Sequence, residues 1–109
     1  MGIIYMGKTE EIFHKIAGEV PGAKESKMFG ALCIKAPNGK AAVMVWKDNL
    51  VFKLEGAAMQ AAISLDGAGI FEPMEGRPMG GWVRVPVAYS DKWGSFAHKS
   101  MEIVRKLKK

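Results

Sequence analysis

The stretch ALCIKAPNGKAAVMVWKDNLVFKL, residues 31–54, decides the fold of this 109-residue chain. It holds three short apolar runs, which the turn-forming segments PNG and KDN separate: residues 31–36, 40–46 and 50–54. Loops of three residues between such runs are typical of antiparallel hairpins. The stretch therefore predicts three neighbouring antiparallel strands.

A helix is expected before these strands, over residues 9–19. Thr9 is a suitable N-cap, and the two glutamates that follow it suit the first turn of a helix. Apolar residues recur at helical spacing and form one stripe: Ile12, Phe13, Ile16, Ala17 and Val20. Pro21 and Gly22 end this helix, and a short strand follows at residues 27–29.

The C-terminal half predicts a short helix over residues 57–64, strands at 70–74 and 82–85, and a last helix over 90–107 with Ser90 as its N-cap. The inner face of the last helix is expected to hold six apolar residues: Trp93, Phe96, Ala97, Met101, Val104 and Leu107. The predicted fold class is α+β, a two-layer antiparallel sheet of five to six strands packed with three helices, in the order α-β-β-β-β-α-β-β-α. A chain of this length forms one domain, residues 1–109.

Composition favours a folded protein of a reducing compartment. Half of the residues are hydrophobic, and Cys33 is the only cysteine, so no internal disulfide is available. The N-terminal segment does not resemble a signal peptide, and no apolar stretch is long enough to span a bilayer. We expect a cytoplasmic protein without membrane partners.

The formal net charge of +5 is concentrated at the C-terminus, where residues 99–109 hold five basic residues and one acidic residue. A basic end of a helix is favoured by the helix dipole and by solubility. The same charges would also suit contacts with nucleic acid. Both interpretations of the basic end remain open from the sequence.

Strand polarity predicts a homodimer. In residues 40–46 both sets of alternating side chains are apolar, whereas a small sheet with helices on one face normally has a polar second face. A second copy of the chain is the commonest cover for such a face. Ala41, Val43 and Val45 are the residues expected on the face that the second copy covers. The alternative is that helices wrap the sheet and that small side chains remain exposed.

Five segments in register carry a family resemblance: MFG at 28–30, NGK at 38–40, DNLVFKL at 48–54, FEP with GR at 71–77, and WVRVP at 82–86. Over nearly the whole chain the sequence resembles the TfoX/Sxy N-terminal domain family and, more distantly, the MmcQ/YjbR group. The resemblance implies an α+β domain with an antiparallel sheet against helices, commonly dimeric. Competence regulators of this family carry a further helical domain, so transcriptional or competence regulation is a secondary expectation here.

Candidate reactive residues do not form a catalytic constellation in the sequence. Cys33 lies within a predicted apolar strand, and His14 and His98 are isolated on separate helices without the spacing of metal ligands. The segment LDGAGIFE lacks the third glycine of a dinucleotide fingerprint. We expect no enzyme activity, no cofactor and no metal, and we give a small enzyme of unknown type the lowest rank.

The favoured function is a non-enzymatic, homodimeric binding module whose partner is a protein or a small ligand. The alternative is a nucleic-acid-binding protein that uses the basic C-terminal helix. Six residues are candidate contacts with an anion or with nucleic acid: Arg77, Arg84, Lys92, Lys99, Arg105 and Lys106.

Overall fold

The computed structural model describes residues 4–28, 31–46, 49–72, 76 and 80–107. Its elements follow one another in this order: α1 (Ile4–Glu19), β1 (Lys24–Met28), β2 (Ala31–Lys35), β3 (Ala41–Trp46), β4 (Asn49–Lys53), α2 (Gly56–Ile63), β5 (Gly69–Ile70), β6 (Trp82–Pro86), the 3₁₀ turn η1 (Val87–Tyr89) and α3 (Ser90–Arg105). The predicted fold class and element order are confirmed.

The sheet has six strands in the order β1-β2-β3-β4-β6-β5, and every neighbouring pair is antiparallel. The first four strands follow the chain, as successive hairpins do. β6 then inserts between β4 and β5, so the C-terminal strand becomes an inner strand of the sheet. The turn between β2 and β3 contains Gly39 at φ +84°, a backbone conformation that glycine adopts without steric cost.

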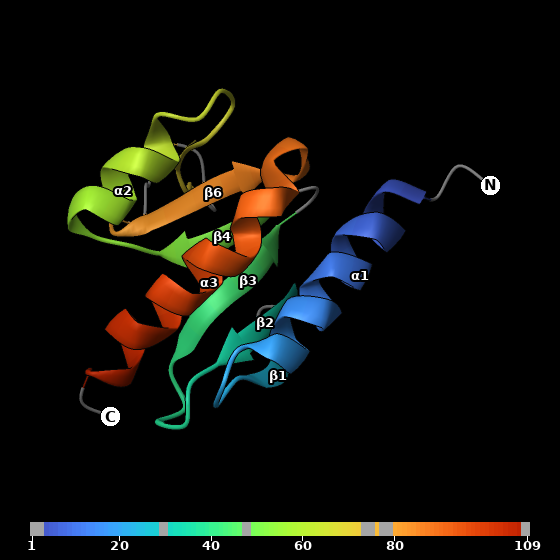
Figure 1. The fold of residues 1–109 in the computed structure, drawn as a ribbon, viewed down its shortest axis with the longest axis vertical. Coiled ribbons are helices and arrows are strands. Elements are labelled where there is room, and N and C mark those ends of the chain that lie inside the picture. Colours follow the sequence, from blue (N-terminus) through green and yellow to red (C-terminus); the bar gives the residue numbers. More distant parts are fainter. Residues whose placement is uncertain (1–3, 29–30, 47–48, 73–75, 77–79, 108–109) are drawn as a thin grey trace.

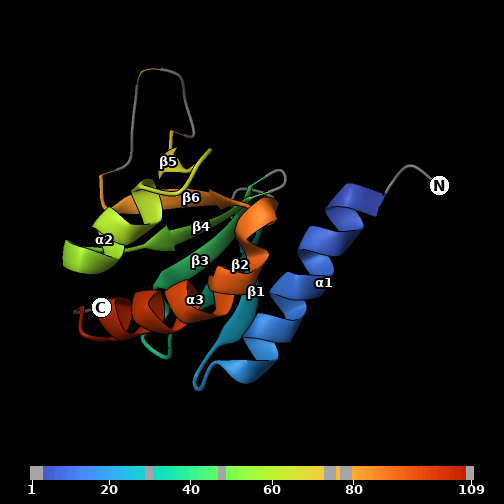
Figure 2. The ribbon, with the colours of Figure 1, turned by 45° about the horizontal axis from the view of Figure 1, so that its top comes forward.

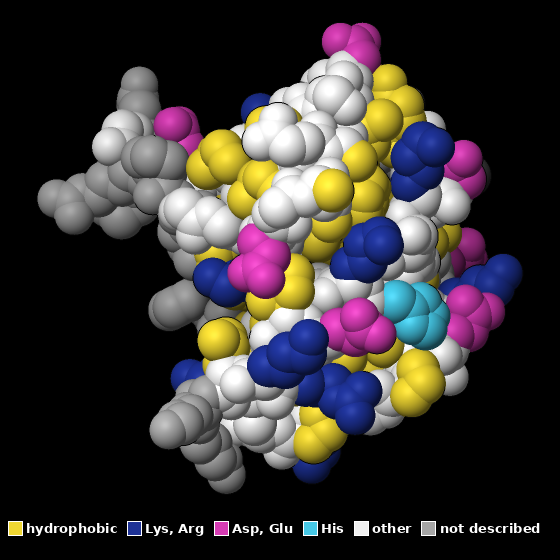
Figure 3. All heavy atoms as spheres, turned by 60° about the vertical axis from the view of Figure 1, so that its left-hand side comes forward, with side chains coloured by type: hydrophobic (Ala, Val, Ile, Leu, Met, Phe, Trp, Pro, Cys, Tyr) yellow, Lys and Arg dark blue, Asp and Glu magenta, His cyan; other side chains and the backbone are white. Residues whose placement is uncertain are grey.

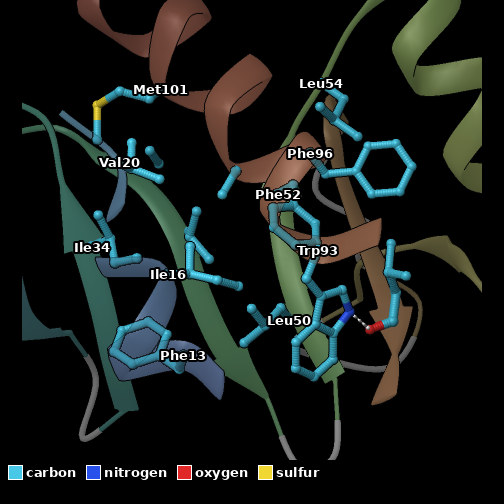
Figure 4. Close-up of a cluster of buried hydrophobic side chains, with 14 of the residues drawn as sticks. Phe13, Ile16, Val20, Ile34, Leu50, Phe52, Leu54, Trp93, Phe96 and Met101 are labelled. Atoms are coloured by element: carbon cyan, nitrogen blue, oxygen red, sulfur yellow. Dashed lines mark hydrogen bonds between the residues drawn. The ribbon is translucent and has the colours of Figure 1, made fainter. Parts of the chain in front are cut away.

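All three helices pack against one face of the sheet. In Figures 1 and 2, α3 crosses β3 and β4 while α1 lies beside it towards β1 and β2. The side chains between the layers form the main core, in which Phe13 and Ile16 of α1 and Trp93 of α3 meet the valines and leucines of the sheet (Figure 4). Apolar residues of α2 and of the turn that follows it pack against the same core: Ala58, Met59, Ala62, Ile63 and Leu65.

Side-chain hydrogen bonds fix both ends of α3 to the rest of the chain. The Trp93 indole Nε1 donates to the Val85 carbonyl oxygen of β6 at 3.1 Å, so the N–H of the largest buried side chain has a hydrogen-bond partner. At the other end of α3, the Asn38 amide donates to the carbonyl oxygens of Val104 and Leu107 at 2.9 and 3.0 Å. These bonds hold the turn between β2 and β3 against the C-terminal end of α3, where the Val104 carbonyl oxygen also accepts from the Leu107 N–H at 3.0 Å.

The β2 to β3 pairing contains a bulge that α3 completes. Ile34 pairs with Val43 but the next residue, Lys35, pairs with Ala41, so Ala42 is an extra residue on β3. The Ser100 hydroxyl of α3 donates to the Ala42 carbonyl oxygen at 2.5 Å and accepts from the Lys53 N–H at 2.9 Å. This hydroxyl therefore joins β3 to β4 at the position where their own ladder stops.

Three local expectations from the sequence are wrong. α1 begins at Ile4, five residues before Thr9, so Thr9 is not the N-cap of this helix. Thr9 is instead fully buried inside the helix, and its Oγ1 has no hydrogen-bond partner among the described residues. Ser90 is not the N-cap of α3, because the 3₁₀ turn before the helix places Tyr89 at that position. Leu107 is not on the buried face of α3 but 43% exposed, since the helix ends at Arg105.

The buried stripes of the two long helices follow the predicted spacing. Phe13, Ile16 and Ala17 of α1 are buried, as is Val20 directly after it, and so are five of the six residues predicted for the inner face of α3. Part of the predicted strand at residues 70–74 lies outside the described residues. Among the helices that the structure describes, none combines the length and apolarity that crossing a bilayer requires.

Candidate functional site

The described helices all lie on one face of the sheet, and we call the opposite face the outer face. Alternation along each strand assigns its residues, and the described part comprises Lys24 and Ser26 of β1, Cys33 and Lys35 of β2, Met44 and Trp46 of β3, Asn49, Val51 and Lys53 of β4, and Trp82 and Arg84 of β6. The cross-strand register supports this assignment, because Cys33, Met44, Val51 and Arg84 lie in one row across four strands.

The structure corrects the predicted orientation of β3. Val43 and Val45, expected on the face that a second copy covers, belong to the main core and are only 1% and 6% exposed. Ala41 lies beside the bulge at the start of the strand. Both faces of β3 are apolar as predicted, but α1 and α3 cover the valine side. Met44 and Trp46 point to the outer face instead.

A second, smaller hydrophobic cluster lies on the outer face. Cys33, Met44, Val51 and Phe71 are buried in it, and Trp46 and Trp82 pack against it while remaining partly exposed. The rings of Trp46 and Phe71 meet edge to face, with centroids 5.2 Å apart. The apolar strand residues of this face are therefore covered by the chain itself, and two tryptophans form the boundary with solvent.

The polar residues of the outer face are strongly biased to positive charge. Lys24, Lys35, Lys53 and Arg84 come from four different strands, and no carboxylate occupies an outer-face position of the described strand residues. Glu25, the acidic residue of β1, faces the helical side of the sheet, because side chains alternate along a strand. Its Oε1 lies 2.7 Å from Nδ1 of His14 in α1. The outer face thus carries four cations and no acidic side chain within its strands.

Lys53 and Trp82 associate as a cation and an aromatic ring on this face. They are direct cross-strand partners, and the Lys53 ammonium lies over the Trp82 ring, 5.7 Å from its centroid. Arg84 is anchored at one end, because its Nη1 donates to the Gly67 carbonyl oxygen at 2.7 Å. This bond holds the guanidinium at the β5 edge of the outer face.

Cys33 is buried within the outer cluster and does not present a reactive thiol. Burial raises the pKa of the Cys33 thiol, and the nearby positive charge of Lys35 opposes this only in part. A protonated thiol is a poor nucleophile. The structure therefore supports the interpretation of Cys33 as a packing residue.

A groove of about 420 Å³ lies on the helical side of the molecule, between α2 and α3. Figure 3 shows this side, where hydrophobic side chains alternate with Lys and Arg side chains. The groove is lined by apolar, basic and acidic residues together: Ala61, Leu65, Asp91, Lys92, Ser95, Phe96 and Lys99. Its mixed charge distinguishes it from the outer face.

The predicted contacts with anions or nucleic acid do not form one surface. Arg84 lies on the outer face, whereas Lys92 and Lys99 line the groove on the opposite side, and Arg105 and Lys106 lie at the end of α3. Arg77 lies outside the described residues. Lys24, Lys35 and Lys53 are not among the contacts predicted from the sequence, although alternation within each strand is the pattern that places them on one face.

The histidines remain separate, as predicted: His14 pairs with Glu25, and His98 lies exposed on α3. In the described parts of the chain, no three His, Cys, Asp or Glu side chains gather as metal ligands do. No protein-family model, curated protein or solved structure matches this chain.

Proposed function

We propose that this chain is a non-enzymatic binding module of the cytoplasm and that the outer face of its sheet is the binding surface. The observation that carries the proposal is the composition of that face. Partly exposed tryptophans and four cations lie together on the sheet, on the face opposite the helices that the structure describes. Aromatic and Arg side chains are enriched at binding surfaces, because they offer large contact areas with fixed geometry.

The family resemblance supports the same function. A domain similar to the TfoX/Sxy N-terminal family is expected to act through association, and its members are commonly dimeric. We therefore propose a homodimer as well, with regulation of transcription or competence as a role for the module. The homodimer rests on the resemblance alone, because the helices cover the valines that the sequence predicted at its contact.

Light scattering coupled to size exclusion tests the homodimer. A dimer at micromolar concentration is expected, and a monomer throughout that range would remove the homodimer from the proposal. Acrylamide quenching of tryptophan fluorescence adds the location of the contact. Trp93 is fully buried in the main core, so concentration-dependent protection from quenching reports on Trp46 and Trp82 of the outer face.

Nucleic-acid binding through α3 is a second candidate, because Lys92 and Lys99 have no ion-pair partner among the described residues. Asp91 and Glu102 lie close to them on the same helix and reduce the local positive charge. Neutralising Lys92 and Lys99 together is the variant that tests this surface. A large loss of binding in that variant would favour α3 over the outer face.

A further inference from the structure

We infer that the outer face binds single-stranded nucleic acid, with a base stacked on Trp82 and phosphates held by Lys24, Lys35, Lys53 and Arg84. The inference rests on the proposed function of this face as a binding surface and adds the chemical class of its ligand. It uses a different surface from the basic C-terminal helix, and the two surfaces are tested separately below.

The aromatic part of the surface is suited to stacking. Trp82 lies at the start of β6 and Trp46 at the end of β3, each partly exposed above a cluster of buried apolar side chains. Trp46 is further supported by its edge-to-face contact with Phe71. An aromatic ring held on a sheet accepts any base on its face, since every base has a π-surface.

The Lys53 ammonium is already associated with the Trp82 ring. A base that stacks on this side of the ring displaces the ammonium towards the adjoining phosphate. Alternation of aromatic and cationic side chains is characteristic of surfaces that bind single strands. A duplex keeps its bases stacked on one another, so the tryptophans favour an unpaired strand.

The charges select a polyanion over a second copy of this chain. In a two-fold symmetric dimer the same patch meets itself, which would place the four cations of one copy against the equally basic patch of the other. Like charges opposed across an interface oppose association. A phosphate backbone complements the same four cations and gains from the release of its counterions.

The test is fluorescence anisotropy with a labelled oligonucleotide of about 12 nucleotides, a length within the range that a small β-sheet domain covers. Oligo-dT, oligo-U and a duplex of equal length are titrated at low salt and again at rising salt. Binding of the single strands in preference to the duplex is expected. The logarithm of the binding constant falls linearly with the logarithm of the salt concentration, and the magnitude of this slope should decrease by roughly 0.7 for each phosphate contact removed.

Two matched pairs of substitutions assign the surface. Lys24→Gln with Lys35→Gln removes two charges from the outer face, and Lys92→Gln with Lys99→Gln removes the same charge from the opposite side. The outer pair is expected to weaken binding roughly tenfold and the helix pair to change it less than about threefold, because phosphate contacts are local. Trp82→Ala is expected to weaken binding roughly tenfold by removing a stacking partner.

Failure of the inference and failure of the proposed function are distinguishable. Equal effects of the two lysine pairs, or no binding at low salt, would overturn the inference. If light scattering then shows a dimer that Trp82→Ala dissociates, the outer face remains a binding surface, with a second copy as its partner. If Trp82→Ala does not fold, the lysine pairs still decide the test. Lys24 is exposed and Lys35 partly exposed, so their replacement by glutamine should leave the fold intact.

Discussion

Replacing Ser100 by alanine removes one hydroxyl that serves two strands, and the structure allows its cost to be estimated. Ser100 is fully buried in α3, and its hydroxyl connects the Ala42 carbonyl oxygen with the Lys53 N–H. Alanine leaves both backbone groups without that partner. A buried polar group that loses its hydrogen bond costs about 1–3 kcal/mol.

The expected net effect is smaller than the sum of the two maximal costs. The Lys53 N–H is only partly buried, so water replaces some of its lost bond. Alanine also has the better helix propensity, by about 0.5 kcal/mol. We expect Ser100→Ala to lower the free energy of unfolding by about 2–3 kcal/mol, a large share of the 5–15 kcal/mol typical of a domain.

Ser95→Ala is the matched control, because Ser95 lies exposed on the same helix and shares the gain in propensity without the loss of these bonds. Denaturant unfolding of both variants gives the difference between their midpoints at a constant slope. Amide hydrogen exchange adds a local measurement, in which the Lys53 amide of Ser100→Ala should exchange faster. A midpoint equal to that of Ser95→Ala, or unchanged exchange at Lys53, would refute the reasoning.

Three further predictions concern single side chains. Asn38→Asp should lower the unfolding free energy by about 1–3 kcal/mol. It removes the donor to the carbonyl oxygens of Val104 and Leu107, and it places a negative charge at the negative end of a helix. Thermal unfolding of Asn38→Asp and of Asn38→Ala separates the effect of the charge from that of the lost donor. Thr9→Val should raise stability by about 1 kcal/mol, since it removes a buried hydroxyl without a described partner, and a lower denaturation midpoint would contradict this. Cys33 should react with a disulfide reagent at pH 8 only when the protein opens, since its side chain is fully buried and burial also raises its pKa. Rapid modification of the folded protein would show an accessible thiolate.

Local patterns were sufficient to predict most of the fold. The three-residue turns and the apolar runs between them gave the hairpins from β2 to β4, and the helical stripes gave the buried sides of α1 and α3. These predictions succeed because the spacing of side chains within one element depends on backbone geometry alone. Helix ends were less predictable: neither Thr9 nor Ser90 is a cap, although both residue types favour that position.

The candidate site depended on contacts between distant parts of the chain. Lys53 and Trp82 are 29 positions apart in sequence and become neighbours because β6 pairs with β4 instead of extending the sheet beyond β5. Along the chain, aromatic and basic residues do not interleave around Trp46 and Trp82 in the pattern that binds single strands. Cross-strand pairing produces that interleaving on the outer face.

The amino-acid sequence by itself determined the order of the elements and the apolar character of both faces of β3. It left open which face the helices cover, because Val43 and Val45 are as apolar as Met44 and Trp46 on the other side. Tertiary packing decided this when α1 and α3 enclosed the valines in the main core. The same choice brought the tryptophans and cations of separate strands together on the outer face, because alternation carries every second residue of a strand to the side opposite the helices.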